Sequence, residues 1–136
     1  MLTIFSTGCA PAIEISPTDN VNRIEIFDQK GISSRIAAGG REALDKPTSI
    51  VSDPKRISHV LAFLRERNRL WHYPPFETPG SRYTITFYDG DDHRFVIWLG
   101  EVEICGRSSG EYSQHNRCRY IRSADVAELK RLLEIE

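Results

Sequence analysis

The hydrophobic positions of this chain follow two periods, one of two residues and one of three to four. The period of two predicts β-strands, in which successive side chains point to opposite faces. It is clearest in residues 83–88 and 95–99, and the Asp89-Gly90 dipeptide between them favours a tight hairpin because glycine tolerates a positive φ. The expected strands are 21–28, 83–88, 95–99, about 101–105 and about 117–122.

The period of three to four predicts two helices. Asp53-Pro54 has the residues of a helix start, since the carboxylate can accept hydrogen bonds from free N–H groups and the proline loses no donor there. This helix is expected to end near Asn68, with a buried stripe of Ile57, Val60, Leu61 and Leu64. The second is expected from Ala124 to about Glu134, with Ser123 as its N-cap and with Val126, Leu129, Leu132 and Leu133 inward.

Strands grouped together, with helices at intervals, predict an α+β fold. We expect an antiparallel sheet of about four to five strands with two helices packed on one face. The other face would be partly exposed, with Tyr88, Val96 and Trp98 on it. Residues 29–47 are rich in Gly, Ser and Ala and form either a surface loop or a broken hairpin whose second strand the pattern does not place.

The composition of the chain bears on the number of domains, on nucleic-acid binding and on membrane spanning. The chain has 136 residues, of which 40% are hydrophobic and 27% charged, so one domain with a real core is expected. Eighteen Lys and Arg against 19 Asp and Glu give a formal net charge of -1, which removes the usual electrostatic argument for nucleic-acid binding. No apolar run approaches the roughly 20 residues of a spanning helix, which excludes a polytopic membrane protein.

The first residues contain a candidate export signal. A short apolar stretch, residues 2–5, is followed by small residues and a cysteine in the order Ser6-Thr7-Gly8-Cys9. This segment resembles the lipobox of bacterial lipoproteins, in which Gly or Ala precedes an invariant cysteine. The resemblance implies that Cys9 is diacylated and becomes the mature N-terminus. It also implies a bacterial cell-envelope protein, lipid-anchored and facing the periplasm or exterior.

On this interpretation residues 1–20 comprise a truncated signal, the lipobox and a polar tether, and residues 21–136 form a single α+β domain. Ser6 stands where lipoproteins usually have Leu, and no Lys or Arg precedes the apolar stretch. Two alternatives therefore remain open. The true start codon lies upstream, or the match is accidental, residues 2–5 form an edge strand and the protein is cytoplasmic.

The other two cysteines, Cys105 and Cys118, flank a polar segment that connects two expected strands. If they are adjacent across antiparallel strands, their Cα atoms fall near disulfide distance, and the bridge stabilises by about 3 kcal/mol. The alternative is a pair of reduced thiols in a cytosolic protein. The chain has no Cys-x-x-Cys motif and its histidines are scattered, so we predict no metal site, and no cofactor is indicated.

Two sets of side chains are candidates for binding. Exposed aromatic residues flanked by arginine are typical anchors of protein interfaces, which makes Trp71, Tyr73, Phe76 and Trp98 the candidate interface, beside Arg65, Arg67 and Arg69. The alternative is that Trp71 and Phe76 pack back to cap the sheet. A second set alternates on a strand, Arg117, Arg119 and Arg122, and we expect Glu101, Glu103 and Glu111 to balance it across the sheet.

No sequence motif indicates catalysis. The Asp89, Asp91, Asp92 and His93 cluster is explained by a turn, and Ser108-Ser109-Gly110 lacks the pattern of a nucleophile elbow. The leading hypothesis is therefore an envelope-anchored domain that binds a protein partner or has a structural role, without catalytic residues. The alternatives are a small enzyme or ligand-binding protein using Asp92, His93 or His115 between sheet and helices, and an inhibitor of an envelope enzyme that inserts loop 106–117.

Overall fold

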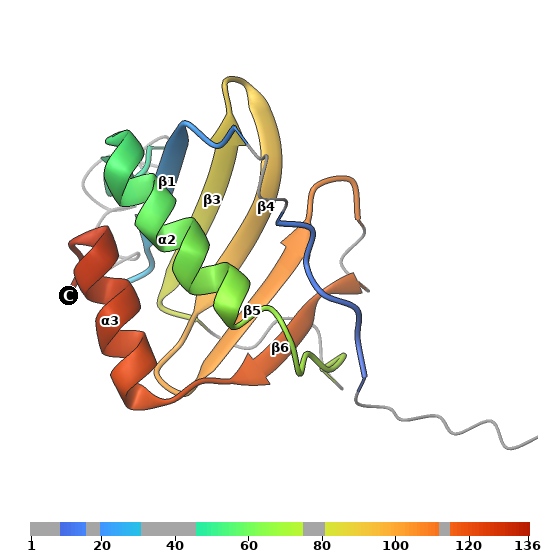
Figure 1. The fold of residues 1–136 in the computed structure, drawn as a ribbon. Helices are drawn as coiled ribbons and strands as arrows, with labels where there is room; N and C mark the ends of the chain where they lie inside the picture. Colours follow the sequence, from blue (N-terminus) through green and yellow to red (C-terminus); the bar gives the residue numbers. More distant parts are fainter. Residues whose placement is uncertain (1–8, 16–19, 31–45, 75–80, 112–114) are drawn as a thin grey trace, which may run out of the picture.

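The computed structural model of the chain describes residues 9–15, 20–30, 46–74, 81–111 and 115–136, and Figure 1 shows their arrangement. They form a six-stranded sheet in the order β2-β1-β3-β4-β5-β6, in which every neighbouring pair is antiparallel. The strands are β1 Arg23–Asp28, β2 Ser49–Val51, β3 Tyr83–Asp89, β4 Asp92–Leu99, β5 Glu103–Ser108 and β6 Arg117–Tyr120. The helices are α2 Pro54–Glu66 and α3 Ser123–Leu133.

Both helices cover the same face of the sheet, which confirms the α+β prediction (Figure 1). About four to five strands were expected, and five ranges were placed from the sequence. The sheet has a sixth strand because the short apolar stretch Ser49–Val51 forms an edge strand. This strand, β2, pairs with β1 so that Val51 lies opposite Ile24. Three residues are too few for a period of two to be recognised, so only the long-range pairing reveals β2.

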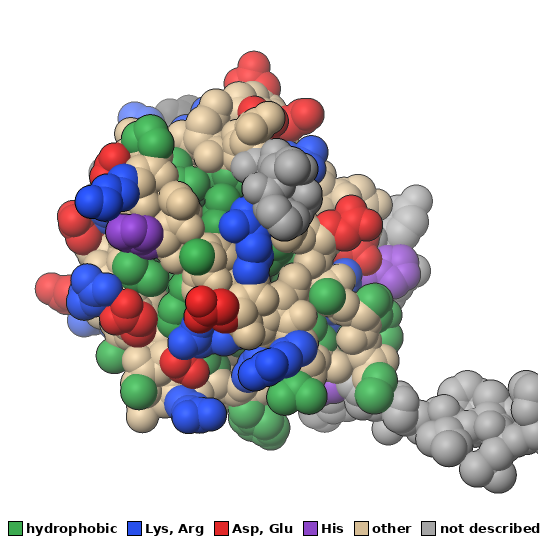
Figure 2. Space-filling view, viewed as in Figure 1, with side chains coloured by type: hydrophobic (Ala, Val, Ile, Leu, Met, Phe, Trp, Pro, Cys, Tyr) green, Lys and Arg blue, Asp and Glu red, His purple; other side chains and the backbone are tan. Residues whose placement is uncertain are grey.

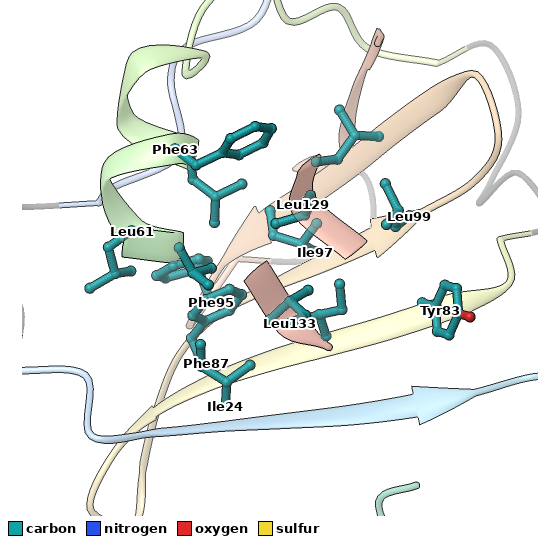
Figure 3. Packing of buried hydrophobic residues seen from close by; sticks show 14 of the residues in the cluster. Ile24, Leu61, Phe63, Tyr83, Phe87, Phe95, Ile97, Leu99, Leu129 and Leu133 are labelled. Atoms are coloured by element: carbon teal, nitrogen blue, oxygen red, sulfur yellow. The ribbon is translucent and has the colours of Figure 1, made fainter. Parts of the chain in front are cut away.

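The core lies between the two helices and the sheet. Alternate residues of β1, β3 and β4 face the helices, as the pattern predicted, and the Phe87 and Phe95 rings stack with centroids 4.1 Å apart. Figure 3 shows side chains of both helices, among them Leu61 and Leu129, pointing toward those of β3 and β4. Gly90, at φ 60°, makes the predicted hairpin turn between β3 and β4.

The helix ends are only partly as predicted. Asp53 caps α2 by accepting a hydrogen bond from the Lys55 N–H at 3.3 Å, but α2 ends at Glu66 rather than near Asn68. The predicted N-cap of α3 is wrong: the cap position is Arg122, with no side-chain hydrogen bond, and Ser123 is already in the helix. Neither helix has the length and hydrophobicity to cross a membrane.

The N-terminal segment packs against this domain. Ile13 is only 1% exposed and belongs to the core cluster. Its backbone makes two hydrogen bonds with the Asn68 side chain, at 2.9 Å and 2.6 Å, and the Ala10 N–H bonds to the Trp71 carbonyl at 2.9 Å. Residues 10–15 therefore belong to the packed domain, whereas the sequence placed residues 11–20 in a tether. Residues 16–19 lie outside the described part of the chain.

Candidate functional site

The three candidate interface residues in the described part of the chain, Trp71, Tyr73 and Trp98, do not form one surface. Trp71 is 5% exposed, packs in the core and donates a hydrogen bond from Nε1 to Asn68 at 2.8 Å, so the capping alternative holds for it. Trp98 lies on the opposite face of the sheet, opposite Cys105, with the Arg107 guanidinium 5.5 Å from its ring. Tyr73 is exposed, and Phe76 lies outside the described residues. An aromatic interface built on Trp71 is therefore wrong.

The candidate enzyme residues Asp92 and His93 lie at the start of β4. The register of β3 and β4 shifts between Phe87 and Tyr88, which places His93 beside Tyr88 on the face away from the helices, with the rings 5.7 Å apart. Burial, and then the charge of Arg107, lower the pKa of His93. His115 precedes β6, and its carbonyl accepts a hydrogen bond from Arg117 at 2.8 Å. His93 therefore does not lie between sheet and helices.

The two paired cysteines lie where the sequence predicted. Cys105 and Cys118 are directly opposite one another on β5 and β6, with Cα atoms 4.0 Å apart and the sulfurs bonded. Glu103 lies near them, with Oε1 3.5 Å from the Cys105 sulfur. Both sulfurs are used by the disulfide, so this cluster has no thiolate to offer a metal ion. Residues 112–114 of the loop between these strands lie outside the described part, so the inhibitor interpretation of loop 106–117 stays a prediction.

The arginines of β6 have different partners from one another. Arg117 is 2% exposed and binds the Glu111 carboxylate through both terminal nitrogens, at 2.8 Å to 3.3 Å, so the balance expected between the arginine set and the glutamates is found for this one arginine. Arg119 instead donates to the backbone carbonyls of Arg67 and Arg69. The structure therefore brings the arginines that follow α2 next to those of β6.

These side chains line a hollow of about 270 Å³ between the end of α2, the end of β6 and the start of α3. We call it the arginine hollow, and its lining residues are Glu66, Arg67, Arg69, Arg119, Arg122 and Asp125. Four guanidinium groups and two carboxylates leave a formal excess of two positive charges. All four of these arginines belong to the two sets that the sequence places apart, and only the tertiary contact between Arg119 and the turn after α2 joins them.

The charges inside the arginine hollow are unevenly paired. Arg67 bonds to Asp125 at 3.0 Å, and this hydrogen bond lowers the pKa of the Asp125 carboxyl. Burial lowers the pKa of Arg119, and the charge of Arg69 lowers it further. Among the described residues, neither the Arg69 nor the Arg122 side chain has a hydrogen-bond or ion-pair partner. Asp125 therefore compensates only part of the repulsion between the cations at this site.

Comparison of the chain with protein-family models, with curated proteins and with solved structures finds no match in any of the three. The function therefore has to be inferred from the residues and geometry of the chain itself.

Proposed function

We propose that this chain is an envelope lipoprotein domain, anchored through Cys9, that binds anionic groups in the arginine hollow. The observation that carries the proposal is the formal excess of two positive charges in the hollow, where the Arg69 and Arg122 side chains have no hydrogen-bond partner among the described residues and lie beside the guanidinium of Arg119. A guanidinium presents a planar fork of donors that matches carboxylate and phosphate oxygens. An anion bound here would relieve the repulsion between the arginines and satisfy donors that lack a protein partner.

The position of Cys9 supports the anchoring part of the proposal. Cys9 is an exposed free cysteine, and the residue after it bonds to the domain, from the Ala10 N–H to the Trp71 carbonyl. Acyl chains on Cys9 would therefore lie outside the core and leave the packing of Ile13 unchanged. The signal residues before Cys9 lie outside the described part of the chain.

Anion binding is tested by titrating inorganic phosphate into the full chain carrying Cys9→Ser, followed by calorimetry or amide chemical shifts. We expect saturable binding that is about tenfold weaker in Arg69→Gln and in Arg122→Gln, because each removes charge-assisted hydrogen bonds. Arg131→Gln is the matched control, since Arg131 lies on α3, pairs with Glu128 at 2.7 Å and does not line the hollow. Equal binding by all three variants, or no binding by the parent, would refute the assignment.

Anchoring is tested by intact mass. The gene is expressed from its native locus with the codons upstream of Met1, and the product is weighed in membrane and soluble fractions. We expect a membrane-bound chain that starts at a diacylated Cys9, and a Cys9→Ser variant that is released to the soluble fraction. An unmodified chain with a free Cys9 thiol in the soluble fraction contradicts the lipoprotein hypothesis.

A further inference from the structure

Large exposed hydrophobic side chains gather at the edge of the sheet formed by β6. Of the five in the described residues, only Ile50 lies elsewhere, on β2 at the opposite edge of the sheet. The other four, which we call the apolar rim, are Leu70, Tyr73, Val102 and Tyr120.

Backbone contacts hold the apolar rim together. His72, between Leu70 and Tyr73, exchanges two hydrogen bonds with Cys118 of β6, at 2.9 Å and 2.8 Å. The rings of His72 and Tyr120 are 6.3 Å apart, and the Val102 carbonyl accepts from the Ile121 N–H at 3.0 Å. The four rim residues therefore come from segments that lie side by side at this edge of the sheet.

Neither the packing of the domain nor the backbone conformation at position 70 favours a leucine. Its side chain is 78% exposed, so it adds little to the core, and its φ of 62° is a left-handed conformation that every residue with a Cβ disfavours. Asn or Gly would suit this backbone better. The side chain of Leu70 is therefore available for an apolar contact outside the domain.

The apolar rim adjoins the arginine hollow and the attachment point of the N-terminal segment. Arg69 directly precedes Leu70, and Arg119 directly precedes Tyr120. Figure 2 shows basic and hydrophobic side chains next to one another on the lower part of the face in view. The opposite end of the sheet carries the β3–β4 hairpin with Asp89, Asp91 and Asp92, and acidic side chains appear there in the same view. The end of the domain that carries the apolar rim thus also carries the arginines of the hollow, with Glu101 and Glu103 on either side of Val102.

We propose that the apolar rim and the arginine hollow together dock on the surface of an anionic lipid bilayer. The leucine and the tyrosines would lie at the boundary between headgroups and acyl chains, where amphipathic aromatic rings are favoured. The arginines would contact lipid phosphates, and basic residues near an anionic surface are attracted to it. The acidic hairpin would point away from the bilayer.

This inference rests on the proposed function for its choice of a bilayer as the partner. If Cys9 carries the acyl chains, only about 4 Å of backbone, one residue, separates it from Ala10, which is bonded to the domain. So short a connection holds the neighbouring surface against the membrane. That surface includes the turn from Arg67 to Tyr73, whose Trp71 carbonyl receives the Ala10 bond.

The test uses the full chain with Cys9→Ser, so that no acyl chain contributes, and vesicles of phosphatidylcholine with or without phosphatidylglycerol. We expect co-sedimentation with the phosphatidylglycerol vesicles only. Binding should weaken as salt rises from about 0.1 M to about 1 M, because the Debye length falls from about 10 Å to about 3 Å. Arg69→Gln and Arg122→Gln should each weaken binding about fivefold.

The apolar rim is tested with Leu70→Asn, which removes the leucine and suits the positive φ, so the variant is expected to fold at least as well as the parent. We expect about tenfold weaker vesicle binding for Leu70→Asn. Ile50→Asn is the matched control, since Ile50 is an exposed apolar residue at the far edge of the sheet, and its binding should equal that of the parent.

Equal binding to both kinds of vesicle, or Leu70→Asn binding like the parent, would overturn the docking proposal. Phosphate binding without vesicle binding would leave the anion site standing and refute the bilayer as its partner. Vesicle binding that depends on Leu70, in a chain that is not acylated in cells, would support docking and refute the lipid anchor.

Discussion

The side chain of Ile13 lies directly over Gly106, in the middle of β5. A Cβ atom at position 106 would come 2.4 Å from Ile13 Cδ1 and 2.8 Å from Ile97 Cδ1. The absence of a side chain at Gly106 is therefore what allows the N-terminal segment to pack on the sheet. Because this segment begins next to Cys9, the same contact fixes where an anchor at Cys9 would leave the domain.

Gly106→Ala is expected to destabilise the domain by about 1–3 kcal/mol, since the added methyl group overpacks the site. The measurement is the free energy of unfolding in urea. In an Ile13→Ala background the same substitution should cost less, because the closest atom is gone. Strictly additive effects of the two substitutions would show that Ile13 does not pack on Gly106.

Glu111→Gln is expected to cost about 2–4 kcal/mol in unfolding free energy, because it leaves the buried Arg117 guanidinium without its counter-charge. The range extends down to about 2 kcal/mol because Glu111 is partly exposed and solvent screens its interaction with Arg117. Replacing both partners, in Glu111→Gln with Arg117→Met, should cost less than Glu111→Gln alone, since no buried charge is then left unpaired. If the double variant is less stable than Glu111→Gln alone, the loss of stability in Glu111→Gln does not come from an unpaired buried Arg117.

Reduction of the Cys105–Cys118 disulfide is expected to lower stability by about 3 kcal/mol, the amount expected for a closed loop of this length. Thermal unfolding with and without reductant measures the effect. The double variant Cys105→Ser, Cys118→Ser should unfold at the temperature of the reduced parent and should not respond to reductant. A Cys9→Ser variant serves as the control and should keep the full response, because Cys9 is not bonded to another cysteine.

The free energy of unfolding is expected to decrease as the pH is lowered below about 7, because His93 takes up a proton more readily in the unfolded chain. Burial, and then Arg107, hold the folded pKa of His93 below its ordinary value of 6.5, so the unfolded chain binds the proton more readily. The contribution of neutral His93 to stability is therefore fully present above about pH 7. It is lost as the pH falls from the pKa of His93 in the unfolded chain through its pKa in the folded chain. NMR titration of the imidazole gives the folded pKa, and Arg107→Gln should raise it. An unchanged pKa in that variant would exclude Arg107 as a cause.

The elements that were predicted correctly depend on residues close together in sequence. Asp53-Pro54 starts a helix and Asp89-Gly90 makes a hairpin because each acts within a few residues. The alternation in residues 83–88 and 95–99 identifies the core face for the same reason, since strand side chains alternate whatever the partner strand is. The pairing of Cys105 with Cys118 followed from two strands joined by one connection.

The arginine hollow and the burial of Trp71 depend on contacts that local patterns do not record. Arg119 meets the carbonyl of Arg67 across 52 positions of sequence, and Ile13 meets Asn68 across 55. An aromatic residue among prolines has the same local signal whether it packs or is exposed, so Trp71 could not be placed from its neighbours alone.

The sequence by itself determined the fold class, the two helices, the central hairpin and the cysteine pair, because short-range periodicity and turn chemistry specify them. The tertiary structure decided which segments meet at the end of the sheet. Only the antiparallel order of β4, β5 and β6 brings the turn after α2 beside β6 and the start of α3, and so collects the arginines of three segments in one hollow. Charge and apolar surface gather there because packing of the core places those segments side by side.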